Sequence, residues 1–441
     1  MRAEQSVARQ SHSICEFKKT NCFALPAMTI QNNKMYKILL LFLPIFALSN
    51  TLKVGKSEAY KTISQAVAAA KSGDSILVEK GIYFENIILD KPLYLIGKNR
   101  PVIDARKKGE NIIIKADRVT VKGFKLINSG RDEVLSIAAI HIYNSSYSVI
   151  DNNILENNHF GVYTQRGYRC LIQNNKITTN RGTSQENIGD GIHNLGCEEM
   201  WIKNNFISGH KDGIYLEKTK KSYIYHNLSR KNLRYGLHFM FANDCVYSRN
   251  IFDNNSAGIA VMYALNIGMA GNKFLNNWGD SVYGLLLKDI SYSKIKNNIF
   301  DNNTNAIFAD GATRIDFYSN TFENNGWAMK VNANCMENRV SRNNFINNVF
   351  DVSTSGTMVM NDFKQNYWDK YEGYDLDKDK IGDVPFHPLS MYSVLAEQNP
   401  SVMLLFRTFF VDLLDKTEKV IPSLTPESFV DDEPRMKVVK N

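Results

Sequence analysis

The sequence has no hydrophobic run after residue 49 that is long enough to cross a membrane, and only six of its 441 residues are cysteines. A membrane-spanning helix needs roughly 18 or more consecutive apolar residues. Lys and Arg exceed Asp and Glu by eight, but no segment combines these basic residues with aromatic ones in blocks. The excess is typical of a solvated surface, and we expect no nucleic-acid partner.

A short apolar segment near the N-terminus has the order of a secretory signal. Met35–Lys37 supplies a charged start, Ile38–Leu48 an apolar stretch, and Ala47 and Ser49 the small residues of a cleavage site. We assign 35–49 as a signal peptide, so the mature chain should begin near Asn50 and lie outside the cytoplasm. Residues 1–34 precede this signal and are interpreted as a non-native upstream extension.

A recurring asparagine reveals an internal repeat with a period of mostly 22 residues. The series is Asn153, Asn175, Asn205, Asn227, Asn250, Asn272, Asn298, Asn320, Asn344 and Asn366. Two positions later stands an apolar residue in every coil but one: Leu155, Ile177, Ile207, Ser229, Phe252, Phe274, Phe300, Phe322, Ile346 and Trp368. This column should point inward, and a second asparagine five positions after the first should mark another corner.

Short alternating segments lie between these asparagine corners and a third column of Gly or Ala. With this period, they predict an all-β fold, a right-handed parallel β-helix over residues 50–372, with coils about 4.8 Å apart. Two insertions, Arg181–Asp190 and Trp278–Tyr283, should leave the same corner, where solenoids usually place binding loops.

Both ends of the β-helix carry segments with helical patterns. The amphipathic stretch Tyr60–Ala70 predicts a short N-terminal capping helix, because an open end exposes unpaired backbone. Residues 373–398 form an acidic loop and linker, and residues 399–441 a helical tail. Its amphipathic helix begins at Asn399-Pro400 and carries Val402, Leu405, Phe406, Phe409, Phe410, Leu413 and Leu414. This helix either caps the last coil or docks on a partner.

The repeat register tests the cysteines. Cys170 and Cys245 share one column but lie three coils apart, about 14 Å, beyond the roughly 7 Å limit for a disulfide. We therefore expect both to be core residues, and Met269 too. Cys197 and Cys335 fall in corners.

Two outward columns suggest a metal site. One reads His141, Tyr163, His193, Tyr215, His238 and Ala260, and the other reads Tyr143, Gln165, Leu195, Glu217, Met240 and Met262. Met240 and Met262 should stack on adjacent coils with His238 beside them, and thioether and imidazole ligands suit the soft ion Cu(I). The alternative is a Met- and Tyr-rich contact surface without metal.

A second candidate metal site follows the repeats. Asp375, Asp377, Asp379 and Asp383 lie mostly at alternate positions, a spacing with which an oxygen-rich loop can wrap Ca²⁺. Lys380 and Phe386 exclude an EF-hand. The alternative is an acidic turn that ends the β-helix.

Asp190 and Asp212, each before a corner glycine, could form the stacked carboxylates of a polysaccharide hydrolase or lyase. However, Asp before Gly is also a common turn residue, and we find no third acid or basic segment to support them. We therefore expect no enzyme and no catalytic residues, with a β-helix lyase or hydrolase and a surface adhesin as alternatives.

Four segments resemble the NosD-type accessory proteins of nitrous-oxide reductase maturation. They are Arg234–Phe241 (RYGLHFMF), Asn254–Tyr263 (NNSAGIAVMY), Asn366–Asp369 (NYWD) and Ile381–Phe386 (IGDVPF). The resemblance covers about Leu52 to Met436 and is specific at these motifs, whereas the other coils match only as generic carbohydrate-binding and sugar-hydrolase repeats.

This resemblance implies a periplasmic protein that joins an ABC transporter made of a membrane permease and a cytoplasmic ATPase. It also implies a role in supplying copper to nitrous-oxide reductase, with the ion received from a lipoprotein chaperone. The family supplies no catalytic residues. Its motifs include His238, Met240 and Met262, the residues that the outward columns bring together.

Overall fold

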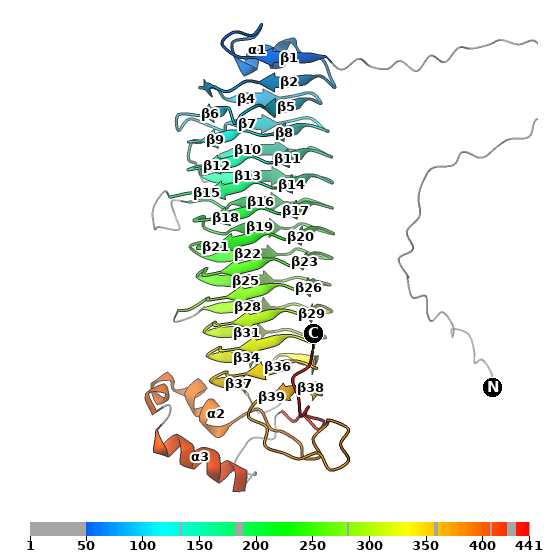
Figure 1. Ribbon diagram of the computed structural model, residues 1–441, viewed down its shortest axis with the longest axis vertical. Helices are drawn as coiled ribbons and strands as arrows, with labels where there is room; N and C mark the ends of the chain where they lie inside the picture. Colours follow the sequence, from blue (N-terminus) through cyan, green and yellow to red (C-terminus); the bar gives the residue numbers. More distant parts are fainter. Residues whose placement is uncertain are drawn as a thin grey trace, which may run out of the picture. The chain divides into compact units, whose positions relative to one another are not determined.

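The computed structural model describes residues 50–132, 135–180, 188–279, 282–356, 360–405, 408–420 and 429–440. The upstream extension and signal peptide lie outside the described residues, as do residues 181–187 and 280–281 of the two insertions. From residue 50 onward the chain winds into a right-handed parallel β-helix, and each complete coil adds one strand to each of three sheets (Figure 1). The predicted all-β class and architecture are confirmed.

The three sheets contain 14, 13 and 12 strands and are called sheets A, B and C. Sheet A contains β1 (Thr51–Val54), β2 (Ser75–Val78), β5 (Tyr94–Gly97), β8 (Thr120–Lys122), β11 (Val149–Asp151), β14 (Leu171–Gln173), β17 (Trp201–Lys203), β20 (Tyr223–Tyr225), β23 (Val246–Ser248), β26 (Gly268–Ala270), β29 (Lys294–Lys296), β32 (Asp316–Tyr318), β35 (Met336–Ser341) and β38 (Met360–Lys364). Sheet B contains β3 (Ile82–Tyr83), β6 (Val102–Asp104), β9 (Lys125–Ile127), β12 (Ile154–Glu156), β15 (Lys176–Thr178), β18 (Phe206–Ser208), β21 (Leu228–Arg230), β24 (Ile251–Asp253), β27 (Lys273–Leu275), β30 (Ile299–Asp301), β33 (Thr321–Glu323), β36 (Asn344–Ile346) and β39 (Tyr367–Trp368). Sheet C contains β4 (Ile87–Leu89), β7 (Ile112–Ile114), β10 (Ala138–Tyr143), β13 (Phe160–Gln165), β16 (Ile192–Leu195), β19 (Ile214–Glu217), β22 (Tyr235–Met240), β25 (Ala257–Met262), β28 (Tyr283–Lys288), β31 (Asn305–Asp310), β34 (Trp327–Val331) and β37 (Phe350–Ser353).

The inward column on sheet B forms an aromatic stack along the axis of the β-helix. The ring centroids of Phe274 and Phe300 are 4.4 Å apart, and those of Phe300 and Phe322 are 5.0 Å apart. The stack ends on Trp368, whose ring lies 4.0 Å from that of Phe345. The predicted inward residue before Trp368 was wrong by one position, because Phe345 and not Ile346 points inward.

The predicted asparagine ladder runs through one corner of the β-helix. From Asn153 to Asn366, each buried side-chain amide donates to the side-chain oxygen of the next asparagine at 2.9 to 3.2 Å. The ninth position is Asn343 rather than the predicted Asn344, whose amide instead donates to the Val439 carbonyl at 3.0 Å. The two asparagines are adjacent, so the period alone did not separate them.

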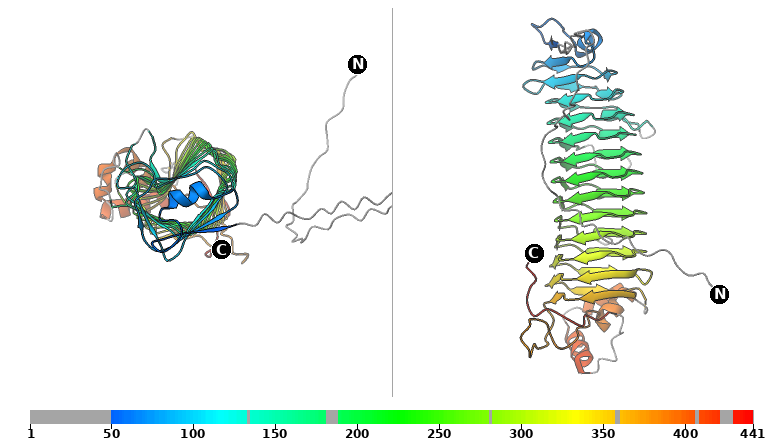
Figure 2. Two further views of the ribbon diagram at one scale, coloured as in Figure 1. Left: turned by 90° about the horizontal axis from the view of Figure 1, so that it is seen from above. Right: turned by 90° about the vertical axis from the view of Figure 1, so that its right-hand side faces the viewer.

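The N-terminal end carries the predicted capping helix, α1 (Ile63–Ala69). The Thr62 hydroxyl accepts from the Gln65 N–H, and the Gln65 side chain accepts in return from the Thr62 N–H. This capping box fixes the start of the helix. Viewed from above in Figure 2, α1 lies across the opening of the first coils.

The described part of the C-terminal segment contains two α-helices, α2 (Met391–Gln398) and α3 (Phe409–Val420), and a 3₁₀ helix at Pro400–Leu405. Helix α2 lies in the segment expected to be loop and linker. The segment predicted as one amphipathic helix after Asn399 is 3₁₀ at Pro400–Leu405 and α-helical at Phe409–Val420, and Phe406 lies outside the described residues. Tyr392 and Ala396 of α2 form a buried cluster with Val411 of α3 and with Trp327 and Phe350 of sheet C. These helices therefore pack on the side of the last coils. No helix in the described ranges is long and apolar enough to cross a membrane.

The cysteines of the described chain, Cys170, Cys197, Cys245 and Cys335, are all buried and free. Cys170 and Cys245 are fully buried, as is Met269, which confirms their predicted place in the core. Burial raises the pKa of the Cys170 thiol to about 11 and that of Cys245 to about 12, which disfavours the thiolate.

Candidate functional site

The two predicted outward columns lie side by side on the outer face of sheet C. We call the first the histidine row, which comprises His141, Tyr163, His193, Tyr215 and His238 of β10, β13, β16, β19 and β22. Each residue of the row is in register with the next one on the neighbouring strand. After His238 the same position is occupied by Ala260, which ends the row. Neighbouring rings are 4.4 to 5.0 Å apart between centroids. The three histidines, Tyr163 and Ala260 are nevertheless buried, each at most 8% exposed.

Each histidine of the row has a carboxylate partner on one ring nitrogen. Nδ1 lies 3.3 Å from Glu110 Oε1 in His141, 2.9 Å from Asp190 Oδ2 in His193 and 3.1 Å from Asp212 Oδ2 in His238. The Nε2 atoms of all three are buried and have no hydrogen-bond partner within the described part of the chain. A carboxylate on Nδ1 favours the tautomer that leaves a lone pair on Nε2, which is how metal-ligating histidines are usually oriented.

Asp212 is the most buried of these carboxylates and has the most partners. Its oxygens accept from Arg234 Nε at 2.8 Å, from the Tyr235 N–H at 3.2 Å and from His238 Nδ1. Burial opposes ionisation, but the hydrogen bonds from Arg234 and His238 outweigh it and lower the pKa of Asp212. Asp212 is therefore ionised and holds the Arg234 guanidinium and the His238 ring in place.

Met240 and Met262 are aligned on adjacent strands, as predicted, and both are partly exposed. Tyr215 is in register with His238, and its hydroxyl donates to Met240 Sδ at 3.4 Å. Because strand side chains two residues apart share a face, His238 and Met240 lie on the same side of β22. The structure thus brings one oriented imidazole and two thioethers to one part of the surface.

Asp190 and Asp212, the candidate catalytic carboxylates, both form hydrogen bonds within the protein. Asp190 binds His193 through one oxygen and accepts the Asp212 N–H at 3.1 Å through the other. Asp212 likewise accepts hydrogen bonds from Arg234 and His238. Both side chains are at most 7% exposed. Each of the two carboxylates therefore orients an imidazole.

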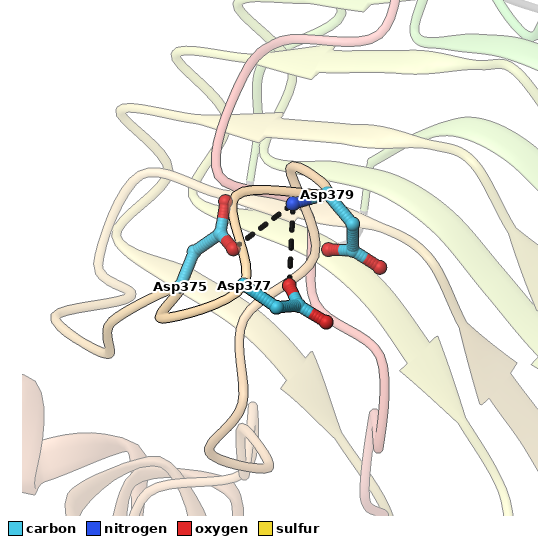
Figure 3. Close-up of side chains that lie close together, drawn as sticks. All are labelled: Asp375, Asp377 and Asp379. Atoms are coloured by element: carbon cyan, nitrogen blue, oxygen red, sulfur yellow. Dashed lines mark hydrogen bonds between the residues drawn. The ribbon is translucent and has the colours of Figure 1, made fainter.

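The acidic loop brings three of its four predicted ligands together. Side-chain oxygens of Asp375, Asp377 and Asp379 lie within 4.8 Å of one another (Figure 3). The Asp379 N–H donates to both Asp375 and Asp377 at 3.2 Å. Asp383 is not part of this group and accepts the Leu376 N–H at 2.7 Å.

Sequence reasoning missed the carboxylate partners of the histidines. Asp190 and His193 are three residues apart, a spacing that could have revealed their pairing. Glu110 and Asp212 come from the preceding coil, 31 and 26 residues from their histidines, and no local spacing signals these contacts.

The fold and this face define a parallel β-helix protein that carries histidine and methionine side chains on the outer face of one sheet. The model of the family described as the periplasmic copper-binding protein NosD matches residues 67–187 and 175–373, and the chain belongs to this family. Two curated relatives are each named a probable ABC transporter binding protein NosD. That of Pseudomonas aeruginosa is 27% identical, with 81% of this chain and 87% of the relative covered. That of Stutzerimonas stutzeri is 25% identical, with 81% and 86% covered.

Solved structures share the fold at much lower identity. A family 28 exopolygalacturonase of Yersinia enterocolitica matches with a TM-score of 0.58 and 11% identity, covering 72% of this chain and 78% of the enzyme. The catalytic unit of an α-1,3-glucanase from Streptomyces thermodiastaticus matches with a TM-score of 0.57 and 14% identity, covering 69% and 65%. At these identities the likeness shows the parallel β-helix alone.

Proposed function

We propose that this protein is a non-enzymatic periplasmic accessory protein of an ABC transporter complex and holds Cu(I) for the copper sites of nitrous-oxide reductase. The observation that carries the proposal is the alignment of Met240 with Met262 beside His238, whose Nδ1 is bound by Asp212. Thioether and neutral imidazole are ligands that prefer Cu(I) to Mg²⁺ or Ca²⁺. The family's description as periplasmic and copper-binding supports the same assignment.

Replacing both Met240 and Met262 with alanine should weaken Cu(I) binding by more than about 100-fold. Loss of an outer-sphere partner alone typically costs a metal site 10- to 100-fold, and this change removes two ligands. The measurement is a Cu(I) titration of the mature chain against a competing chelator under reducing conditions.

The chain offers a matched control for this titration. Met336 and Met360 are also aligned on adjacent strands, in sheet A, and are 44% and 64% exposed. A Met336→Ala, Met360→Ala variant removes a thioether pair from the other sheet and should leave Cu(I) affinity unchanged. Equal affinity of the Met240, Met262 variant and the wild type would show that the proposed site is wrong.

The proposed partners are a permease and ATPase of the transporter, a lipoprotein that delivers copper, and nitrous-oxide reductase as the recipient. An apolar patch near the C-terminus supports a docking role for the tail. Leu404, Phe409, Phe410 and Leu413 are 87%, 81%, 51% and 49% exposed although α3 packs on α2 through Val411. Exposed aromatic clusters of this kind mark interaction surfaces.

A Phe409→Ser, Phe410→Ser variant should co-purify with the permease at least about tenfold less than the wild type does. A buried aromatic anchor often contributes 2 kcal/mol or more to an interface, and about 1.4 kcal/mol corresponds to a tenfold change. Ile82→Ser with Phe84→Ser, at the opposite end, is the control, because both residues are more than half exposed. Undiminished recovery of the Phe409, Phe410 variant would contradict docking through α3.

We also propose that the acidic loop binds Ca²⁺ through Asp375, Asp377 and Asp379, with Asp383 holding the loop backbone. The charge of Asp379 raises the pKa of Asp377 even though the Asp379 N–H favours its ionised form. A bound cation would relieve this repulsion, so Ca²⁺ at 100 times its dissociation constant should stabilise the fold by about 2.7 kcal/mol. Thermal denaturation should show this gain in the wild type and lose it in Asp377→Asn, and an absent gain in the wild type would exclude the site.

A further inference from the structure

His193 occupies the middle of the histidine row but is not part of the proposed Cu(I) site. Its ring lies 4.7 Å from that of Tyr163 and 4.5 Å from that of Tyr215, and the residue is only 8% exposed. Asp190 holds Nδ1 at 2.9 Å, which directs the lone pair to Nε2. That Nε2 atom is buried and has no hydrogen-bond partner among the residues that the structure describes. A buried nitrogen without a hydrogen-bond partner is unfavourable, and its presence here points to a ligand.

Glu217 provides a second ligand group at this nitrogen. Its Oε2 atom lies 3.9 Å from His193 Nε2, and its side chain is 28% exposed. Two atoms that bind one ion at about 2.0–2.2 Å must lie closer together than this, roughly 3–3.5 Å apart. The Glu217 carboxylate must therefore move closer to His193 Nε2 to share an ion with it. Glu217 is in contact with solvent, so its carboxylate is open to an ion from solution.

We propose that His193 Nε2 and the Glu217 carboxylate form a second metal position, which takes a divalent ion of the Zn(II) or Cu(II) class. Imidazole with carboxylate is a harder ligand set than imidazole with two thioethers. Water completes the coordination, so the position is open and exchanges its ion readily. It is built from other residues than the Cu(I) site and does not depend on that site.

The two positions are neighbours on the same face. Glu217 is in register with Met240, so their Cα atoms lie about 4.8 Å apart across the strands. His193 and His238 are two strands apart, roughly 10 Å, with Tyr215 between them. The outer face of sheet C therefore offers a hard and a soft metal position in adjacent coils.

The test uses the full mature chain with Zn(II) alone and, separately, with Cu(II) alone. Zn(II) titration against a chromophoric chelator should give a site that Glu217→Gln and His193→Gln each weaken at least about tenfold, while Cu(I) affinity stays within about twofold. The spectrum of bound Cu(II) in electron paramagnetic resonance should show coupling to one imidazole nitrogen in the wild type and lose it in His193→Gln.

Glu198→Gln is the matched control, because it removes the same charge from an exposed carboxylate that pairs with Lys221. Glu217 is a partly exposed side chain, so its variant keeps the test valid if His193→Gln fails to fold. Zn(II) affinity equal in Glu217→Gln and the wild type, or lowered equally by Glu198→Gln, would overturn the second position. Neither result bears on the Met240 and Met262 titration, so the two proposals fail separately.

Discussion

Asp212→Asn should lower the free energy of unfolding by about 3–5 kcal/mol and weaken Cu(I) binding by about 10- to 100-fold. The wholly buried carboxylate accepts from Arg234, His238 and the Tyr235 N–H, and an amide leaves the partly buried guanidinium without its counter-charge. His238 also loses the partner that orients its ring. Denaturant unfolding measures the first effect, and the Cu(I) competition titration on the folded variant measures the second.

The control for Asp212→Asn is Glu198→Gln, which removes one negative charge from an exposed ion pair. Exposed pairs contribute about 0–1 kcal/mol, so this variant should unfold like the wild type and bind Cu(I) equally well. If Asp212→Asn kept wild-type Cu(I) affinity after loss of stability, the carboxylate would serve the fold alone. The role of Asp212 in orienting His238 would then be wrong.

The fold was predictable because a parallel β-helix repeats the same local sequence pattern in each coil. Most coils repeat an asparagine at a corner, an apolar residue two positions later and alternation along the next strand. A chance match in one coil therefore had little influence on the predicted register. The two errors in the asparagine columns fell where this redundancy was weak. Asn344 competes with its neighbour Asn343. Asn180, the second asparagine that stands five positions after Asn175, is exposed at the start of an insertion.

The candidate site was only half predictable for a related reason. The period fixes which side chains share a face, so it aligned Met240 with Met262 and placed His238 beside them. The period does not determine the rotamers of these side chains. The contact between Asp212 and His238 crosses from one coil to the next, and it depends on rotamers and on Arg234, which the period leaves undetermined.

The C-terminal end was the least predictable part of the fold, because its contacts are not repeated from coil to coil. Asp431, 65 residues after Asn366, places its carboxylate where the next asparagine of the ladder would stand. Its oxygens accept from the Asn366 N–H at 2.9 Å, from the Asn366 amide at 3.0 Å and from Trp368 Nε1 at 3.0 Å. The tail around Asp431, rather than the amphipathic helix, therefore ends the ladder.

Asp431→Ala should destabilise the last coils by about 3–5 kcal/mol, because it leaves several buried donors without an acceptor. In a solenoid each coil contacts mainly its neighbours, so the loss should appear as local opening rather than global unfolding. Hydrogen exchange should therefore accelerate at Asn366 and Trp368 while Asn205 and Asn227 stay protected. Asp432→Ala removes the same charge from the adjacent, exposed position and should change neither rate. Equal protection of Asn366 in the two variants would mean that the backbone pairing of the tail, and not the Asp431 carboxylate, holds the end of the β-helix.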